Sequence, residues 1–423
     1  MKQRRWMLVA TAAVVGLIVP AIGQGKVEPA SLKWTRVQGG GGSIVTSYDF
    51  GVVGALSSES RWFRLGNSSF TRSGKLKVTL TGSPAFSIAH DRCAGKIIGK
   101  QLSCWVAVAY TPGKAGASDS ATLTANGENA AAAKVRLSGT GSGHLYWVEG
   151  NGSSGAVKKV PLGGGKATSL AHDLGQPAAV KVDGTDVYWV DNAGGYLHKV
   201  PLGGGTVTTL THDKDYPFSL AVDGKHAYWG DALGAVKEVG LGGGKVTTLA
   251  TGQGPPLSLT VYGTHLYWAD ADHHAVRAVP IGGGTVTTLA SHLHDPVAVA
   301  VDATHVYWVD AEDGTVNEVP LGGGKVTTLA GGQIQPVSVA VDGSYIYCVD
   351  IATRKVNKVP LGGGTVTTLA TSPGDPTAVA VDSTHVYWID AGGGSLNEVP
   401  LGGGKVTILA SGQATPAALT VGP

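Results

Sequence analysis

The pattern of hydrophobic and polar positions repeats about every forty residues over the last two thirds of the chain. Each repeat carries an aromatic pair of "YW" type, whose tyrosine lies at residues 146, 188, 228, 267, 307, 347 and 387. The unit "PVAVAVDATHVYWVDAEDGTVNEVPLGGGKVTTLA", which begins at Pro296, contains four strand-like segments. Its first segment is small and apolar throughout, as a buried strand requires, and its last alternates threonine with apolar residues, as a half-exposed strand requires. A repeat of this length with four strands predicts a β-propeller in which each unit is one blade.

Three adjacent glycines stand between the third and fourth predicted strands of every unit. The first example, "VPLGGGKATSLA", begins at Val160, and near-copies begin at 200, 239, 279, 319, 359 and 399. Glycine-rich loops can cradle a phosphate, but they do so at the amino terminus of a helix, and no helical pattern follows any triplet. Glycine also adopts positive φ freely, which a tight hairpin requires. The triplets are therefore predicted to be turns.

The two ends of the repeat region complement each other. The first unit starts with "HLYWV" at His144 and lacks an inner strand, whereas the chain ends with "PAALTVGP", an inner strand with nothing after it. We expect the terminal "AALTV" to complete the first blade, so that a propeller over residues 142–423 is closed by its C-terminal strand. The count predicts seven blades, within a range of six to eight.

The order of motifs within the units points to a family. An aromatic pair, an acidic residue, a "VP-L" third strand and "AVD" recur, as in "LYWAD…AVRAVPIGGGTVTTLA…PVAVAVD". In this respect residues 144–421 resemble the YWTD-type, low-density-lipoprotein-receptor-like propellers, which also occur in bacterial proteins. That family typically closes with six blades, and "YWVD" stands here where "YWTD" is expected. The resemblance implies a fold and carries no reaction with it.

Residues 30–141 have a different pattern, with short alternating segments such as "KLKVTL", "CWVAVAY" and "AKVRLSG" between clusters of turn residues. This length and pattern predict one β-sandwich, so the whole chain is expected to be all-β. The segments "YDFGVVG", "FRLGN" and "GSPAFSI", with a cysteine pair leading into "VAVAYTP", resemble the immunoglobulin-like modules called choice-of-anchor D or abnormal-spindle-type domains. The resemblance implies a module that spaces or docks other domains.

The amino terminus predicts export. A basic "MKQRR", an apolar "WMLVATAAVVGLIV" and a small-residue exit "PAIGQG" indicate a signal peptide over residues 1–23. An uncleaved membrane anchor is the alternative, although Gly16 and Pro20 interrupt a run that is marginal for the ~20 residues of a spanning helix. No second hydrophobic segment of that length occurs. The mature protein is thus expected to be secreted, periplasmic or on the cell surface, with no stable membrane span.

Cysteine usage agrees with an oxidising compartment. Cys93 and Cys104 lie 11 residues apart in "CAGKIIGKQLSC", a spacing that a hairpin can bridge with a disulfide. Cys348 replaces the tryptophan of most other repeats, and we expect it to be a buried apolar side chain.

Two sets of polar residues follow the repeat and have a structural interpretation. The acids after the aromatic pairs are expected to bind backbone amides at the end of each second strand; they are Glu149, Asp191, Asp231, Asp270, Asp310, Asp350 and Asp390. The histidines two positions before the tyrosines lie in different blades. Because strands within one sheet are already ~4.8 Å apart, equivalent positions in neighbouring blades should be roughly 10 Å apart, too far to share a metal. These are His144, His226, His265, His305 and His385.

Polar residues outside the repeat consensus gather in two kinds of loop, those between second and third strands and those between blades. Both kinds emerge on the same face of a propeller, which we therefore predict to be the binding face. Its candidate residues are His172, Asp173, His212, Asp213, Asp272, His273, His274, His292, His294 and Asp295. There are two alternatives. The loops are merely solvated and bind no ligand, or a divalent metal binds near His273, His274, His292, His294 and Asp272.

No motif for a nucleophile, a zinc protease or a nucleotide loop appears, and a net charge of +2 with 15% charged residues excludes a basic nucleic-acid-binding surface. The sequence predicts an exported, non-catalytic protein whose propeller binds a protein or a glycan, with no cofactor other than an optional divalent metal. The alternative is an extracytoplasmic lyase or hydrolase that uses the His/Asp-rich face.

Overall fold

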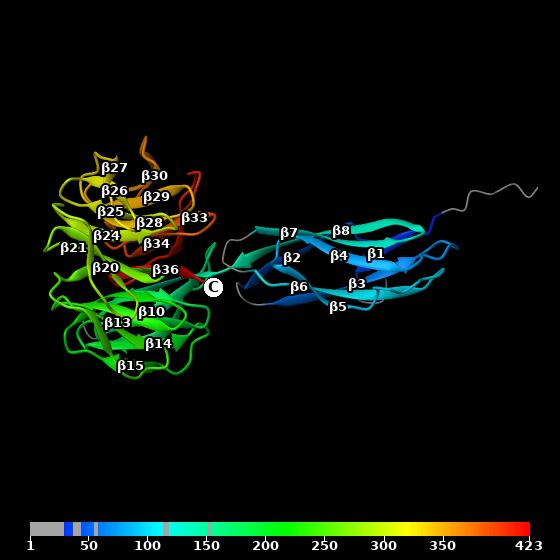
Figure 1. Cartoon of the computed structure of the whole chain (residues 1–423), viewed down its shortest axis with the longest axis horizontal. Coiled ribbons are helices and arrows are strands. Elements are labelled where there is room, and N and C mark those ends of the chain that lie inside the picture. The colour runs from blue at the N-terminus through cyan, green and yellow to red at the C-terminus, as the bar shows by residue number, and fades with distance from the viewer. Residues whose placement is uncertain (1–28, 37–43, 55–57, 113–117, 151–153) are drawn as a thin grey trace, which may run out of the picture.

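The computed structural model describes residues 29–36, 44–54, 58–112, 118–150 and 154–423. These residues form strands and turns only, and this part of the chain contains no helix that could cross a membrane. The predicted signal peptide, residues 1–23, lies outside the described residues. Figure 1 shows an elongated body, coloured blue to cyan, joined to a rounder body coloured green to red.

The elongated body consists of two four-stranded sheets that share one core. One sheet has the order β1 (Leu32–Arg36), β3 (Glu59–Asn67), β6 (Ser103–Tyr110), β5 (Phe86–Asp91), and the other β2 (Ser47–Gly54), β8 (Ala130–Ser142), β7 (Ser118–Gly127), β4 (Leu76–Gly82). Buried Trp34 and Phe63 of the first sheet and Leu123 and Val135 of the second belong to this core. The predicted disulfide is present, because Cys93 and Cys104 are bonded to each other within the core.

The rounder body contains seven four-stranded antiparallel sheets, which together cover residues 144–422. In order from the innermost strand outward, their strands are β36 (Pro416–Gly422), β9 (His144–Glu149), β10 (Gly155–Pro161), β11 (Thr168–Leu174); β12 (Pro177–Val182), β13 (Asp186–Asp191), β14 (Tyr196–Pro201), β15 (Thr208–His212); β16 (Pro217–Val222), β17 (His226–Asp231), β18 (Val236–Gly240), β19 (Thr247–Ala250); β20 (Pro256–Tyr262), β21 (His265–Asp270), β22 (Ala275–Pro280), β23 (Thr287–Ala290); β24 (Pro296–Val301), β25 (His305–Asp310), β26 (Thr315–Pro320), β27 (Thr327–Ala330); β28 (Pro336–Val341), β29 (Tyr345–Asp350), β30 (Lys355–Pro360), β31 (Thr367–Thr371); and β32 (Pro376–Val381), β33 (His385–Asp390), β34 (Ser395–Pro400), β35 (Thr407–Ala410).

The first of these sheets joins the two ends of the repeat region. Strand β36 pairs with β9 in antiparallel register, with Leu419 opposite Trp147. The hydroxyl of Tyr146 donates a hydrogen bond of 2.6 Å to the backbone oxygen of Pro423. Each inner strand contacts the inner strands of both neighbouring sheets, so the seven inner strands surround one axis.

Hydrophobic cores lie between neighbouring sheets rather than within them. Trp189 of one sheet packs with Tyr146 and Val148 of the preceding sheet, and the other interfaces follow the same rule. Cys348 occupies the position of the tryptophan in its sheet, is fully buried, and belongs to the same core cluster as Tyr307 of the preceding sheet. In each repeat the tyrosine thus lies at the interface with the next sheet, and the tryptophan lies at the interface with the preceding one.

Two kinds of turn mark one end of the propeller, which we call the turn face. The glycine triplets connect third and fourth strands, and Gly164 and Gly165 have φ of 95° and 147°, as the sequence predicts. First and second strands are joined by a turn in which Asp183 Oδ1 accepts the amides of Thr185 and Asp186, while Oδ2 accepts the hydroxyl of Tyr188 at 2.8 Å. The opposite end carries the loops between second and third strands and between sheets, and we call it the loop face.

Candidate functional site

The acids that end the second strands hold the loop face in shape. Asp191 accepts amide hydrogen bonds of 2.9–3.2 Å from Gly175 and Gln176, which precede its sheet, and from Gly194, in the loop between β13 and β14. The equivalent aspartates of the other sheets bind loop amides in the same way; they are Asp231, Asp270, Asp310, Asp350 and Asp390. Glu149, the seventh acid, instead pairs with Lys158. The predicted role is therefore confirmed for the six aspartates.

The histidines at the start of the second strands serve local packing. In His305, Nδ1 lies 2.9 Å from the hydroxyl of Thr304, and the ring contacts that of Tyr307 with centroids 6.0 Å apart. His265 and His385 have the same neighbours in their own sheets.

The candidate residues of the loop face fall into separate local groups. His172 pairs with its neighbour Asp173 at 2.6 Å, and both are exposed. His273 lies 3.0 Å from Asp270, and His274 Nδ1 lies 2.8 Å from the backbone oxygen of His294.

His294 itself pairs with Asp313 at 2.7 Å, a hydrogen bond that raises the histidine pKa. The amide of Asp295 donates to Asp310, while burial and the nearby Asp310 and Glu312 raise the pKa of Asp295. Among the described residues, no hydrogen bond or ion pair joins His292 or Asp272 to the other candidates, and His292 has a φ of 59°.

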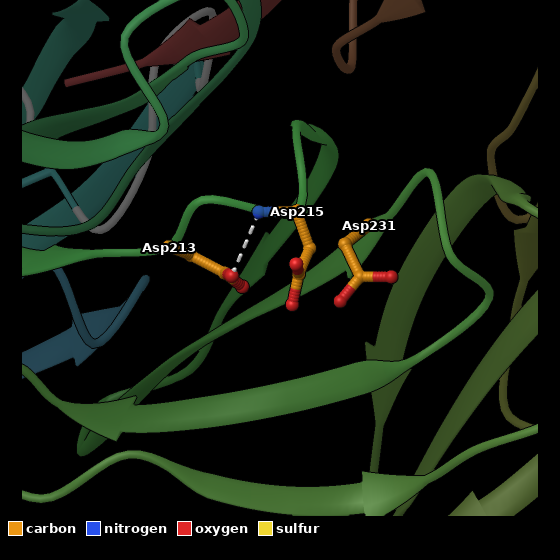
Figure 2. Close-up of side chains that lie close together, drawn as sticks. All are labelled: Asp213, Asp215 and Asp231. Carbon is orange, nitrogen blue, oxygen red and sulfur yellow. Dashed lines mark hydrogen bonds between the residues drawn. The ribbon is translucent and has the colours of Figure 1, made fainter.

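These histidines do not assemble a metal site in the described part of the chain. The only group of three or more ligand-type side chains with atoms within 4.8 Å of one another, among the residues that the structure describes, is Asp213, Asp215 and Asp231. Asp213 is one of the residues predicted for the binding face, and Asp231 is one of the repeat acids predicted to bind backbone amides. These three aspartates lie where the β15–β16 connection meets the end of β17 (Figure 2).

One lysine pairs with all three carboxylates. Lys237 Nζ, from β18, lies 2.9 Å from Asp213, 2.8 Å from Asp215 and 2.8 Å from Asp231. Asp213 also accepts a 2.7 Å hydrogen bond from Nε1 of Trp229. We call Asp213, Asp215, Asp231 and Lys237 the lysine–carboxylate cluster. Its ammonium group occupies the position that a cation would take.

The electrostatics of this cluster favour the charged forms. Burial alone would raise the pKa of Asp213, but hydrogen bonds from Lys237 and Trp229 outweigh it and lower that pKa. Burial likewise opposes the charge of Lys237, yet hydrogen bonds to Asp215, Asp231 and Asp213 raise its pKa well above the ordinary value. Asp213 and Lys237 are therefore charged and bound to each other at neutral pH, which leaves neither of them poised for proton transfer.

The cluster supports an exposed aromatic and apolar surface. Tyr196 stacks on His212 with ring centroids 4.4 Å apart, and the chain continues from His212 through the cluster to Tyr216. The amide of Ala232 donates to the backbone oxygens of Asp215 and Tyr216, which places the adjacent Leu233 beside this segment. Tyr216 and Leu233 are 55% and 72% exposed. We call Tyr196, His212, Tyr216 and Leu233 the Tyr216 patch.

A further cavity lies on the other face. A cavity of 580 Å³ on the turn face is lined by the inner-strand turns of four sheets, among them Asp183, Asp342 and Asp382. Those carboxylates are each engaged by a tyrosine hydroxyl at 2.7–2.9 Å. On the loop face a cavity of 430 Å³ is lined by Gln176, Asn192 and Thr415, away from the histidine pairs.

Comparison with known proteins supports the architecture. No protein-family model matches the chain, and no curated protein matches it. Similar solved structures include the WD40 beta propeller domain of Doa1, with 14% identity over 60% of this chain and 90% of that one and a TM-score of 0.51. The computationally designed Ika8 protein is 16% identical over 66% of this chain and 90% of that one, with a TM-score of 0.53. A nidogen/laminin complex is 22% identical over 52% of this chain and 90% of that one, but its TM-score of 0.45 adds nothing to the assignment. The chain is all-β and contains a β-propeller.

Proposed function

We propose that the protein is exported and binds a protein partner, without catalysis, through the Tyr216 patch on the loop face of its propeller. In this proposal residues 1–23 are a signal peptide, residues 30–141 form an immunoglobulin-like module of the choice-of-anchor D or abnormal-spindle type, and residues 142–423 form a seven-bladed, YWTD-like propeller. The seven four-stranded sheets around one axis support the blade count. The disulfide supports an oxidising compartment.

The observation that carries the binding role is the composition and support of the Tyr216 patch. Tyrosine is enriched at binding hot spots because it offers a large contact area with few rotatable bonds. Tyr216 and Leu233 are exposed, although apolar side chains of their size are usually buried. The lysine–carboxylate cluster beneath them fixes the connecting segment, so that little conformational entropy is lost on binding.

A protein partner fits this patch better than the other candidates do. A patch that combines two tyrosines, a leucine and a histidine matches the mixed apolar and polar character of protein interfaces. An enzyme on the loop face would need an acid or base with a free proton-transfer role, whereas Asp213 is held by Lys237 and Trp229. A glycan ligand is an outcome that the experiment below distinguishes.

The test uses a photo-crosslinking amino acid placed at Tyr216 or, as a matched control, at Val326. Val326 is 37% exposed beside a glycine turn of the turn face. The two labelled proteins are incubated with the extracytoplasmic fraction of source cells, irradiated, and the adducts identified by mass spectrometry. We expect one protein to be enriched at position 216 and absent at position 326. Enrichment at position 326 alone contradicts the proposed face, and a glycan adduct at position 216 contradicts the proposed class of partner.

A further inference from the structure

The inner strands enclose a channel along the propeller axis. The cavity has a volume of 430 Å³ and is lined by residues of β12, β20, β24, β28, β32 and β36. Its lining residues are mostly alanine and valine, with a few serines and threonines. Val299, Val339 and Val379 among them are buried in the cores between neighbouring sheets. It shares Val341, Val381 and Val421 with the 580 Å³ cavity of the turn face, which gives access from solvent. This volume lies within the ~300–1,000 Å³ that is typical of small-molecule sites.

One charged residue lines this channel. Lys181, on β12, stands where the equivalent inner strands carry alanine or threonine, and every other lining residue is uncharged. Among the described residues no carboxylate pairs with Lys181 and no hydrogen bond to its ammonium is present, whereas Lys199 of the same sheet pairs with Asp186. Burial lowers the pKa of Lys181. An ammonium group in such surroundings is costly unless an anion compensates it.

Hydroxyl groups of the same channel can complete an anion site. Ser258 and Ser338 accept hydrogen bonds of 3.2 Å from the amides of Val299 and Val379 in the neighbouring inner strands. Because a hydroxyl that accepts through oxygen still carries its proton, each serine can donate to a ligand. Thr260 lines the cavity as well.

We propose that the axial channel binds a small organic monocarboxylate, whose carboxylate pairs with Lys181 and whose carbon atoms contact the alanine side chains of the inner strands. Alanine methyl groups can contact the carbon atoms of an organic anion, which an inorganic anion lacks. The rim of the turn-face cavity carries Asp183, Asp342 and Asp382, which disfavour ligands with two or more negative charges. This site is distinct from the Tyr216 patch and does not depend on the proposed partner.

The test measures binding of butyrate to the purified protein by isothermal titration calorimetry. Butyramide serves as the neutral analogue, and succinate and inorganic phosphate as the multiply charged ones. Lys181→Met removes the charge and keeps the length of the side chain, and Lys325→Met, beside a glycine turn, is the matched control. We expect the wild type and Lys325→Met to bind butyrate equally, and Lys181→Met to bind it roughly tenfold to a hundredfold more weakly, the range for a hydrogen bond to a charged group. Butyramide, succinate and phosphate should bind more weakly than butyrate.

Several outcomes overturn the proposal. They are unchanged butyrate binding in Lys181→Met, equal binding of butyramide, tighter binding of succinate or phosphate, and no heat of binding with folded wild type at millimolar butyrate. A second variant, Ala340→Leu, narrows the channel without touching the charge, and it should also weaken butyrate binding. Thermal melts of all variants show that each is folded. Lys181→Met should melt no lower than the wild type because an unpaired, half-buried charge is removed.

Discussion

Replacing Lys237 with methionine tests the electrostatic account of the loop face. Methionine keeps much of the length and apolar character of the lysine stem but lacks the ammonium group. In the variant, no ammonium group offsets the repulsion among Asp213, Asp215 and Asp231. The repulsion is costly because the side chain of Asp231 is fully buried. The free energy of unfolding should therefore fall.

The size of the effect follows from burial. The Lys237 side chain is 13% exposed, so solvent screens its contacts with Asp213 and Asp231 only weakly. Removing one partner of a buried ion pair costs about 3–5 kcal/mol. The contact with Asp215 counts for less, because that carboxylate is more exposed. At roughly 2 °C per kcal/mol for a large domain, the melting temperature should drop by about 6–10 °C.

The assay compares thermal melts of Lys237→Met with those of the wild type and of Lys245→Met. Lys245 lies in the same sheet but is exposed beside the glycine turn, and its replacement should stay within about 0.5 kcal/mol. Carboxylate oxygens are good ligands for Ca²⁺. Addition of Ca²⁺ should therefore raise the melting temperature of Lys237→Met and leave the wild type unchanged. Elemental analysis before and after chelator treatment should find no metal at this cluster in the wild type.

Two results would refute this reasoning. One is a Lys237→Met protein that melts within about 1 °C of the wild type. The other is a wild type that responds to Ca²⁺ as strongly as the variant, since its ammonium group should exclude the ion.

Three further predictions concern closure, cysteines and the histidine pairs. Deleting residues 416–423 should destabilise the entire propeller, because β9 loses its partner β36; a truncated protein that melts within about 1 °C of the full chain contradicts this. Native protein should show no reaction of Cys348 with thiol reagents until it is denatured, because burial raises the pKa of this thiol to about 12; rapid labelling in the native state argues against it. The His294–Asp313 pair raises the histidine pKa, so its small stabilisation is present below the unfolded pKa of about 6.5 and is lost as the pH rises through the folded value. Replacing His292 and His294 together with alanine should thus cost little stability, and a large loss at pH 8 relative to pH 5 would show the opposite sign.

The repeat made much of the fold predictable. Glycine triplets, aromatic pairs and small inner strands recur in register, and each local preference agrees with the same four-stranded sheet. The structural role of the second-strand aspartates also followed from their recurrence. A feature that appears in every repeat is needed by every repeat, which argues for scaffold rather than chemistry.

The site was harder to predict, because it depends on departures from the repeat. On the third strand, the residue opposite the second-strand tryptophan is Lys237 in one sheet and Asn317 in another. Among the described residues, the acid at the end of the second strand forms an ion pair only where this third-strand residue is basic. The residue type at this third-strand position carries that signal in the sequence. The same is true of Lys181, a lysine among the alanines and threonines of the inner strands.

The conformations of the loops could not be predicted from the repeat. Tyr216 has a φ of 58°, a conformation that its sequence does not require, and its exposure follows from how residues 213–216 bind Lys237 and Ala232. The histidines of the loops drew attention by their residue type, but they do not converge. His172, His273 and His294 pair with nearby carboxylates, and His274 pairs with a backbone oxygen. Their role in the predicted binding face stays a prediction.

The central claim is that the loop face binds a protein through the Tyr216 patch, and surface plasmon resonance with the purified crosslinked partner tests it most directly. The partner is passed over immobilised wild type, over Tyr216→Ser/Leu233→Ser, and over Val207→Ser/Val326→Ser, which removes two exposed valines from the turn face. The account predicts that the first double variant loses about 2 kcal/mol or more of binding free energy, as hot-spot residues do, while the second binds like the wild type. Full affinity in Tyr216→Ser/Leu233→Ser together with weakened binding in Val207→Ser/Val326→Ser would contradict it.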